Sequence, residues 1–173
     1  MMQGRPPLRT VPDFPRAGIQ FIDITPWLAD GPSFQAAIGE LAAFARELGV
    51  EAVAAPEARG FLVGAPIAAE LGVGFVPVRK PGRLPFQSIR QDYELEYGSA
   101  ALELHVDAIR PGQRVLVVDD LLATGGTVLA AMELIRSVGG VPVGLGFLVE
   151  LNFLGGRQRL GEMPVRTLVQ IDA

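Results

Sequence analysis

The sequence predicts an α/β fold: one domain, residues 1–173, with a doubly wound, mostly parallel sheet flanked by helices. Short apolar runs typical of buried strands alternate with longer helical patterns along the chain. The run 115–118 has no polar face, which favours a strand covered on both sides. Because ligands of open α/β sheets collect at the carboxyl ends of strands, polar residues that follow each strand are the candidate site.

Composition narrows the classes of protein that the chain can represent. The 173 residues suit one domain with one core, and 49% of them are hydrophobic. The net charge of −4 argues against a nucleic-acid partner, and the absence of cysteine excludes a disulfide framework and thiol chemistry. No leader-like apolar region or membrane-length apolar run is visible, so we expect a cytoplasmic protein without a membrane partner.

The N-terminal 32 residues predict an arm followed by a covering segment. Residues 1–12 are rich in proline and lack periodicity, which predicts an irregular arm. Residues 13–30 carry prolines, but also seven large apolar side chains: Phe14, Ile19, Phe21, Ile22, Ile24, Trp27 and Leu28. This segment is too apolar for a linker, so we expect it to pack on the main body as a flap, over a ligand or as a plain hydrophobic lid.

Residues 33–78 predict a helix followed by a β-loop-α-β unit. Ser33 is a favourable N-cap, Gly49 suits the C′ position, and apolar residues between them keep helical spacing. The unit then comprises a strand at 50–55, a loop at 56–61, a helix at 62–71 and a strand at 75–78.

Residues 79–98 predict a flexible lid loop and the start of a hairpin. The part 79–92 carries four cations (Arg79, Lys80, Arg83 and Arg90), two prolines and a glycine, without apolar periodicity. A mobile cationic loop can close over a polyanion and exclude water, although many such loops are simply solvated. Alternation between residues 93 and 106 predicts a hairpin that returns to the sheet.

The segment 115–127, V-L-V-V-D-D-L-L-A-T-G-G-T, is the strongest functional signal. The pair Asp119 and Asp120 stands where the strand should end, and their carboxylates converge only if it has ended by Asp120. A turn of small residues and a helical run, 128–138, offer backbone N–H groups to a phosphate. Each feature alone is more often an ordinary turn, but their order favours a ligand with hydroxyls at one end and phosphate at the other. Neither a Walker loop nor a dinucleotide fingerprint is present.

The segment after the strand 50–55 adds a candidate phosphate ligand, and the rest of the chain predicts further sheet and helix. Arg59 follows the strand 50–55 and presents a fork suited to phosphate, while Gly60 removes a side chain that would block close approach. The alternative is a surface pair of Arg59 with Glu57 or Glu70. Further strands are expected at 141–151 and 166–171, the latter at an edge, with a helical turn at 155–160. We take His105, the only histidine, as structural.

The segment 115–127 resembles the phosphoribosyl pyrophosphate (PRPP) motif of type I phosphoribosyltransferases. The segments P-D-F-P…G-I-Q-F-I-D-I-T, E-A-R-G-F, V-R-K-P-G-R-L-P and Y-E-L-E-Y-G extend the resemblance, over almost the whole chain and in order, to the adenine phosphoribosyltransferases. The resemblance implies Mg²⁺-dependent transfer of a phosphoribosyl group from PRPP to N9 of adenine, giving AMP and pyrophosphate in purine salvage. It also implies an oxocarbenium-like transition state and a homodimer.

The resemblance assigns roles to named residues. Asp119 and Asp120 would hold the ribose hydroxyls and contact Mg²⁺ at most through water, with no direct protein ligand. The 5′-phosphate would bind the turn Ala123, Thr124, Gly125, Gly126 and Thr127. Pyrophosphate would bind Arg59, Gly60, Lys80 and Arg83. Phe21 and Leu151 would face the base, backbone groups at Gln20 and Ile22 would read its edge, and Glu96 would assist at the purine, so that Glu96, Arg59 and Lys80 are the catalytic residues.

Two departures from the family keep alternatives open. Ile22 stands where the family usually has Arg, and Gln20 where a small aliphatic residue is common. Gln20 adds an amide that suits an oxygenated purine, so xanthine or hypoxanthine is an alternative base. A non-catalytic PRPP-binding regulator of the same fold is a second alternative. Such regulators carry an added DNA-binding domain, which the short proline-rich N-terminal segment does not resemble. Glu96 also has a plain alternative, as a strand residue that faces solvent.

Overall fold

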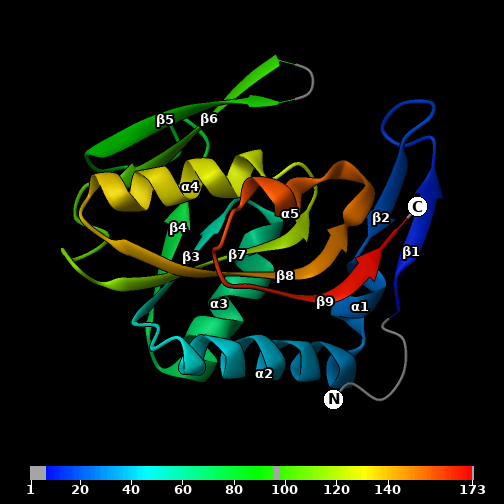
Figure 1. Cartoon of the computed structure of the whole chain (residues 1–173), viewed down its shortest axis with the longest axis horizontal. Coiled ribbons are helices and arrows are strands. Elements are labelled where there is room, and N and C mark those ends of the chain that lie inside the picture. The colour runs from blue at the N-terminus through cyan, green and yellow to red at the C-terminus, as the bar shows by residue number, and fades with distance from the viewer. Residues whose placement is uncertain (1–6, 96–97, 173) are drawn as a thin grey trace.

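A computed structural model of the protein describes residues 7–95 and 98–172, arranged in layers about one parallel sheet (Figure 1). The sheet has the strand order β4-β3-β7-β8-β9, and every neighbouring pair in it is parallel. Its strands are β4 (Gly74–Val78), β3 (Ala52–Pro56), β7 (Arg114–Leu122), β8 (Val141–Leu151) and β9 (Val165–Ile171). The predicted fold class is confirmed, including the edge position of the last strand.

Helices cover both faces of the sheet. In Figure 1, α4 (Gly126–Ser137) lies on one face, and α2 (Gly31–Glu47) and α3 (Arg59–Leu71) lie on the other. Successive residues of β7 divide between the two sides, with Val115 and Val117 in the core beside α4 and Leu116 and Val118 in the core beside α2 and α3. All four side chains have no exposed surface, which explains why this strand has no polar face.

The N-terminal segment forms a small sheet of its own. Strands β1 (Arg9–Pro12) and β2 (Gln20–Asp23) pair antiparallel, and helix α1 (Thr25–Ala29) follows. The prediction of an irregular arm is therefore wrong for Arg9–Pro12, because antiparallel pairing with β2 forms a strand that the residues of β1 do not indicate by themselves. The expectation that this region packs on the main body is confirmed by Ile22, Ile24 and Trp27, which are buried in the core beside α2 and α3.

Two helix starts differ from the prediction. Helix α2 begins at Gly31 with Asp30 as its N-cap, so Ser33 is not the cap, and its hydroxyl donates instead to Asp30 Oδ2 at 2.5 Å. A proline in the first turn pre-organises this earlier start. Helix α3 begins at Arg59 and not at residue 62, which places Arg59 and Gly60 on a first helical turn. The expected C′ residue Gly49 is confirmed by its φ of +60°.

The hairpin β5 (Ser88–Leu95) and β6 (Gly98–His105) is confirmed but does not return to the main sheet. It forms a two-stranded sheet that packs over α4, where Leu102 and Leu104 are buried (Figure 1). A single bridge between Arg79 and Glu103 joins it to the end of β4. Because strand pairing begins at Ser88, the expected loop is shorter, 79–87.

The segment after β8 contains the 3₁₀ helix η1 (Asn152–Leu154) and the short helix α5 (Gly156–Arg159), which confirms the helical turn expected there. Within the described ranges, no helix is both long enough and apolar enough to cross a lipid bilayer.

Candidate active site

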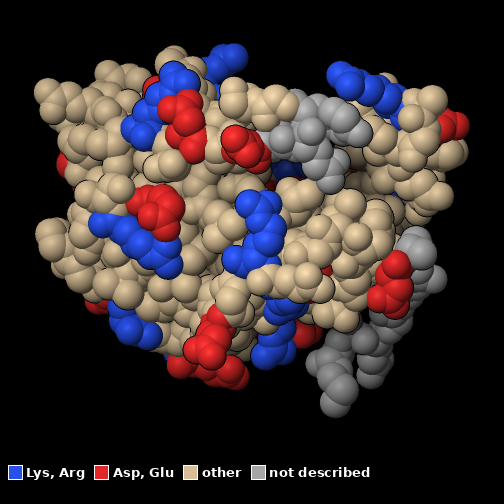
Figure 2. Space-filling model, turned by 45° about the horizontal axis from the view of Figure 1, so that its top comes forward, with Lys and Arg blue, Asp and Glu red and all other residues tan. Residues whose placement is uncertain are grey.

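The carboxyl ends of β4, β3 and β7 lie together at one edge of the parallel sheet. Pro56 pairs with Val78, and the Glu57 N–H donates to the Val78 carbonyl at 2.9 Å. Parallel register therefore brings the residues after β3 and β4 beside the end of β7. Figure 2, turned toward this part of the molecule, shows basic and acidic side chains interspersed over the face in view.

Arg59 links three segments that are far apart in the sequence. Its Nε lies 3.1 Å from Asp120 Oδ2, and its guanidinium carbon lies 5.3 Å from the centre of the Phe21 ring. The alternative pairing with Glu57 or Glu70 is wrong, because those carboxylates accept from Arg79 at 2.6 Å and Arg46 at 3.1 Å. A residue expected at the pyrophosphate thus lies between one expected at the ribose and one expected at the base.

The acid pair lies within β7 and not after it. The strand continues to Leu122, so the prediction that it ends by Asp120 is wrong. Both carboxylates nevertheless lie beside the first turn of α3: a Cβ on Gly60 would stand 3.0 Å from Asp119 Oδ1, and Asp120 contacts Arg59. Proximity to α3 therefore comes from the helix lying across the end of the strand.

Gly60 has a different neighbourhood from the one expected. The space that its side chain would occupy is filled by Asp119, Pro56 and the Val118 carbonyl, each 3.0–3.2 Å from the Cβ position. The absence of a side chain at Gly60 therefore allows α3 to approach β7 closely, and this packing is the reason for glycine that the geometry supplies.

The acid pair is buried, and its charged form would be stabilised by a cation or by hydroxyl donors. Burial, and then the neighbouring Asp120 carboxylate, raise the pKa of Asp119 well above its ordinary value. The Asp120 side chain is 4% exposed. Its Oδ2 has no hydrogen-bond partner among the described residues, since Arg59 approaches at ion-pair distance without hydrogen-bond geometry. Such an orphaned buried oxygen is costly unless a ligand satisfies it.

The turn from Ala123 to Thr127 is the segment expected to bind a phosphate. It lines a cavity of about 60 Å³ together with Asp119, Leu121, Leu122 and Val128. Gly125, in the left-handed region with φ +82°, is the N-cap of α4 and provides no side-chain cap. The first N–H groups of α4 are therefore available to an anion. Gly126 packs closely against the hairpin, where a Cβ would lie 3.3 Å from the Glu94 carbonyl.

The basic segment after β4 contacts the hairpin through Glu103 of β6, a residue to which the sequence analysis gave no role. Arg79 pairs with Glu57, and its Nη1 donates to the Arg83 carbonyl at 3.2 Å. The Gly82 N–H donates to Glu103 Oε2 at 3.0 Å. Lys80 follows directly and is exposed at the same sheet edge as Arg59. No local pattern distinguishes Arg79, the anchoring cation, from the others, because its partners Glu57, in the turn after β3, and Glu103, on β6, lie more than twenty residues away in the sequence.

The residues expected at the base separate into two groups. Phe21 is half-buried between Arg59 and the Phe14 ring, whose centre lies 5.1 Å away, and Gln20 is exposed. Ile22 is 6% exposed and packs in the core, so its side chain is directed away from the surface that Phe21 presents. Leu151, 8% exposed, ends β8 in the same core. Glu96 lies outside the described residues.

Asp23 shares the Phe21 face of β2, and the sequence reading missed it. It accepts two hydrogen bonds of 2.9 Å from the backbone and hydroxyl of Thr25 and pairs with Arg9 at 3.4 Å. The hydrogen bonds from Thr25 lower the pKa of Asp23. It is therefore a fixed negative charge on the side of the N-terminal sheet that faces Arg59.

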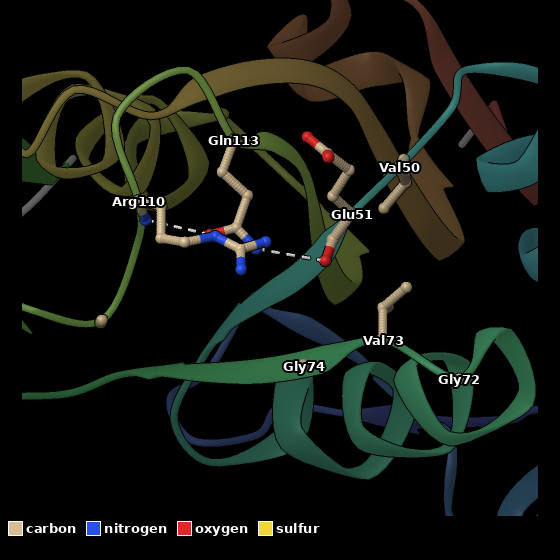
Figure 3. A pocket seen from close by; sticks show the side chains of 8 residues that line it. Val50, Glu51, Gly72, Val73, Gly74, Arg110 and Gln113 are labelled. Carbon is tan, nitrogen blue, oxygen red and sulfur yellow. Dashed lines mark hydrogen bonds between the residues drawn. The ribbon is translucent and has the colours of Figure 1, made fainter.

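A larger cavity, of about 580 Å³, lies at the opposite edge of the sheet (Figure 3). Its polar groups are occupied with one another: Gln113 accepts from the Arg110 N–H at 3.0 Å and donates to the Glu51 carbonyl at 3.2 Å. The cavity is broadly open and lies at the amino ends of β3 and β4, so we do not assign the chemistry to it.

The fold and this site define a transferase of phosphorylated sugars, and the chain belongs to the phosphoribosyl transferase domain family, whose model matches residues 27–167. The chain is similar to an adenine phosphoribosyltransferase of Brevibacillus brevis, with 57% identity over 163 residues, 94% of this chain and 96% of the relative.

Solved structures agree with this assignment. The adenine phosphoribosyltransferase of Thermoanaerobacter pseudethanolicus is 52% identical, with a TM-score of 0.92 and 95% of each chain covered. That of Saccharomyces cerevisiae, solved with adenine and an imino-altritol bisphosphate, is 41% identical, with a TM-score of 0.87 and 93% of each chain covered.

Proposed function

We propose that this protein transfers the 5-phosphoribosyl group of PRPP to N9 of adenine, producing AMP and pyrophosphate in purine salvage. The single observation that carries the proposal is the 3.1 Å approach of Arg59 to Asp120 beside the phosphate cradle. The identity of 57% to an adenine phosphoribosyltransferase and the adenine bound in the yeast relative support the choice of base.

The proposed reaction forms a bond between N9 and C1′ and breaks the bond from C1′ to the pyrophosphate oxygen, while N9 loses its proton. Positive charge develops on the ribose ring in the transition state. Asp119 and Asp120 accept hydrogen bonds from the ribose hydroxyls and stabilise this charge electrostatically. Residues Ala123 to Thr127 hold the 5′-phosphate through N–H and hydroxyl donors, which aligns C1′ with the base.

Departure of pyrophosphate is assisted by cations at the adjoining strand ends. Arg59 moves its charge from Asp120 toward the leaving group, and Lys80 and Arg83 add charge from the segment after β4. Gly60 contributes its backbone N–H at the first turn of α3. Glu96 donates a proton to a ring nitrogen of the purine or stabilises a proton there. The loop between β4 and β5, residues 79–87, acts as a lid that keeps water from the ribosyl cation.

The donor set fits Mg²⁺ held chiefly by substrate. Within residues 7–95 and 98–172, no group of three or more acidic, histidine or cysteine side chains could hold a metal ion. The carboxylate of Asp119 and that of Asp120, whose Oδ2 has no hydrogen-bond partner among the described residues, would hold the ion through water. This suits a cation that keeps most of its hydration shell. When bound, Mg²⁺ neutralises pyrophosphate charge.

The base is held by the N-terminal segment, residues 1–32, acting as a hood. Phe21 and Leu151 contact the two faces of adenine, and backbone groups at Gln20 and Ile22 read its edge. Burial of the Ile22 side chain supports reading by main chain, because the residue that departs from the family pattern then has no side-chain role at the base. The exposed Gln20 amide keeps xanthine or hypoxanthine as the second candidate substrate.

One assay tests the reaction and its alternatives. Purified protein is incubated with Mg²⁺, PRPP and adenine, hypoxanthine or xanthine in turn, and the nucleotide is detected. AMP as the main product supports the proposal, and a different nucleotide reassigns the base. No nucleotide with any base, together with retained PRPP binding, would make the protein a non-catalytic regulator. Omission of Mg²⁺ should abolish the product.

The proposed form of the protein is a cytoplasmic homodimer. Light scattering should give a mass of twice the 18.4 kDa of one chain, and a mass of one chain would contradict the dimer. Cell fractionation with a membrane marker tests the location.

A further inference from the structure

We propose that helix α5 is a positioning element for the 5′-phosphate turn: Gly156 and Arg159 hold the backbone of Ala123 to Gly125 in shape, and an ion pair between Arg157 and the buried Glu150 holds α5. This inference rests on the proposed function, because the ligand of the turn is the phosphate of a phosphoribosyl group. The residues concerned lie outside the PRPP motif and more than twenty positions after it.

Helix α5 contacts the turn through backbone. A Cβ on Gly156 would lie 2.1 Å from the Ala123 carbonyl oxygen, so only glycine permits the observed approach. A Cβ on Gly125 would lie 3.3 Å from the Gly156 carbonyl. Arg159 Nη1 donates to the Thr124 carbonyl at 2.9 Å. Two successive carbonyls of the turn are therefore held toward α5.

Holding these carbonyls also directs the donors of the turn. In a trans peptide the carbonyl of one residue and the N–H of the next point in opposite directions. With the carbonyls of Ala123 and Thr124 facing α5, the N–H groups of Thr124 and Gly125 point away from it. The 60 Å³ cavity lined by the turn offers these donors to an anion.

An ion pair between Arg157 and the buried carboxylate of Glu150 holds α5 in place. Glu150 of β8 is 2% exposed and accepts from Arg157 Nε at 3.0 Å and Nη2 at 2.5 Å. Thr167 of β9 donates to the same carboxylate at 3.0 Å, and Arg157 also donates to the Val165 carbonyl at 3.3 Å. These bonds tie the short helix to two strands of the central sheet, because four residues alone cannot form a stable helix.

The test compares Gly156→Ala with Gly39→Ala, a helix position in α2 where a Cβ meets nothing within 4 Å. We expect Gly156→Ala to raise the KM for PRPP about tenfold or more, the scale of a lost hydrogen bond to a charged group. Its kcat and its KM for adenine should stay within about twofold, because the base and the leaving group bind elsewhere. Gly39→Ala should leave all three constants unchanged.

A second pair of variants keeps the test valid if Gly156→Ala does not fold. Arg159→Met removes one exposed hydrogen bond to the turn and should raise the KM for PRPP about threefold, while Arg159→Lys restores most of it. Arg46→Met, which loses an exposed pair with Glu70, is the matched control. An unchanged KM for PRPP in Arg159→Met and in folded Gly156→Ala would overturn the inference. A fall in kcat together with equal rises in the KM for PRPP and the KM for adenine would also overturn it.

Calorimetry with ribose 5-phosphate separates this inference from the proposed function. That probe carries the ribose and the 5′-phosphate but no base and no pyrophosphate. If the wild-type protein makes no nucleotide but binds ribose 5-phosphate more tightly than Gly156→Ala does, the proposed function fails and the role of α5 stands. If nucleotide forms and both proteins bind ribose 5-phosphate equally, the role of α5 fails alone.

Discussion

Replacing Arg59 by Ala removes the guanidinium that lies between the Asp120 carboxylate and the Phe21 ring. A hydrogen bond to a charged group contributes roughly 1.5–3 kcal/mol, so kcat/KM for PRPP should fall about ten- to a hundredfold. The Arg59 side chain is 45% exposed but its partner Asp120 is 4% exposed, so the variant leaves a buried carboxylate without its counter-charge, at a cost of about 1–3 kcal/mol. The Tm should therefore fall by up to about 10 °C, and the rates are compared at a temperature where the variant is still folded.

Initial rates at varied PRPP and saturating adenine measure this effect, with scanning calorimetry for Tm. Arg46→Ala is the control, because it also deletes an arginine from an exposed pair on the α2–α3 side and should leave kcat/KM unchanged. Arg59→Lys keeps the charge without the planar fork and should recover only part of the activity. An unchanged kcat/KM for PRPP in Arg59→Ala would refute the role assigned to this residue.

Three further substitutions test other parts of the site. Glu96→Gln should lower kcat more than it raises the KM for PRPP, and the opposite pattern in steady-state kinetics would indicate a structural glutamate. Asp119→Asn should weaken PRPP binding yet raise Tm increasingly with pH: burial raises the pKa of Asp119 above its ordinary 3.8, so the wild type loses stability as pH rises through the raised pKa. Melting curves from about pH 4 upward check this sign, because the loss begins at the ordinary pKa of 3.8, and a difference in Tm that does not change with pH would contradict it. Gln20→Val should leave kcat/KM for adenine within about twofold if backbone groups read the base, whereas a large change in base preference would show that the amide takes part.

The sequence by itself determined the central sheet, the order of its helices and the location of the turn from Ala123 to Thr127. Strands such as β7 are buried on both faces, so their residues are apolar throughout and stand out locally. The motif from Asp119 to Thr127 is also local, because the acids and the turn that follows them are contiguous in the chain. Parallel topology then implies that Arg59 and Lys80 reach the same edge.

Only the tertiary structure decided how these parts meet. The contact of Arg59 with Asp120, the packing of the β5–β6 hairpin on α4, and the close approach of Gly156 to the turn all join residues far apart in sequence. Such contacts depend on how helices and strands lie against one another, which neither propensity nor periodicity encodes. For the same reason the strand could continue beyond Asp120 while both carboxylates still lie beside the first turn of α3.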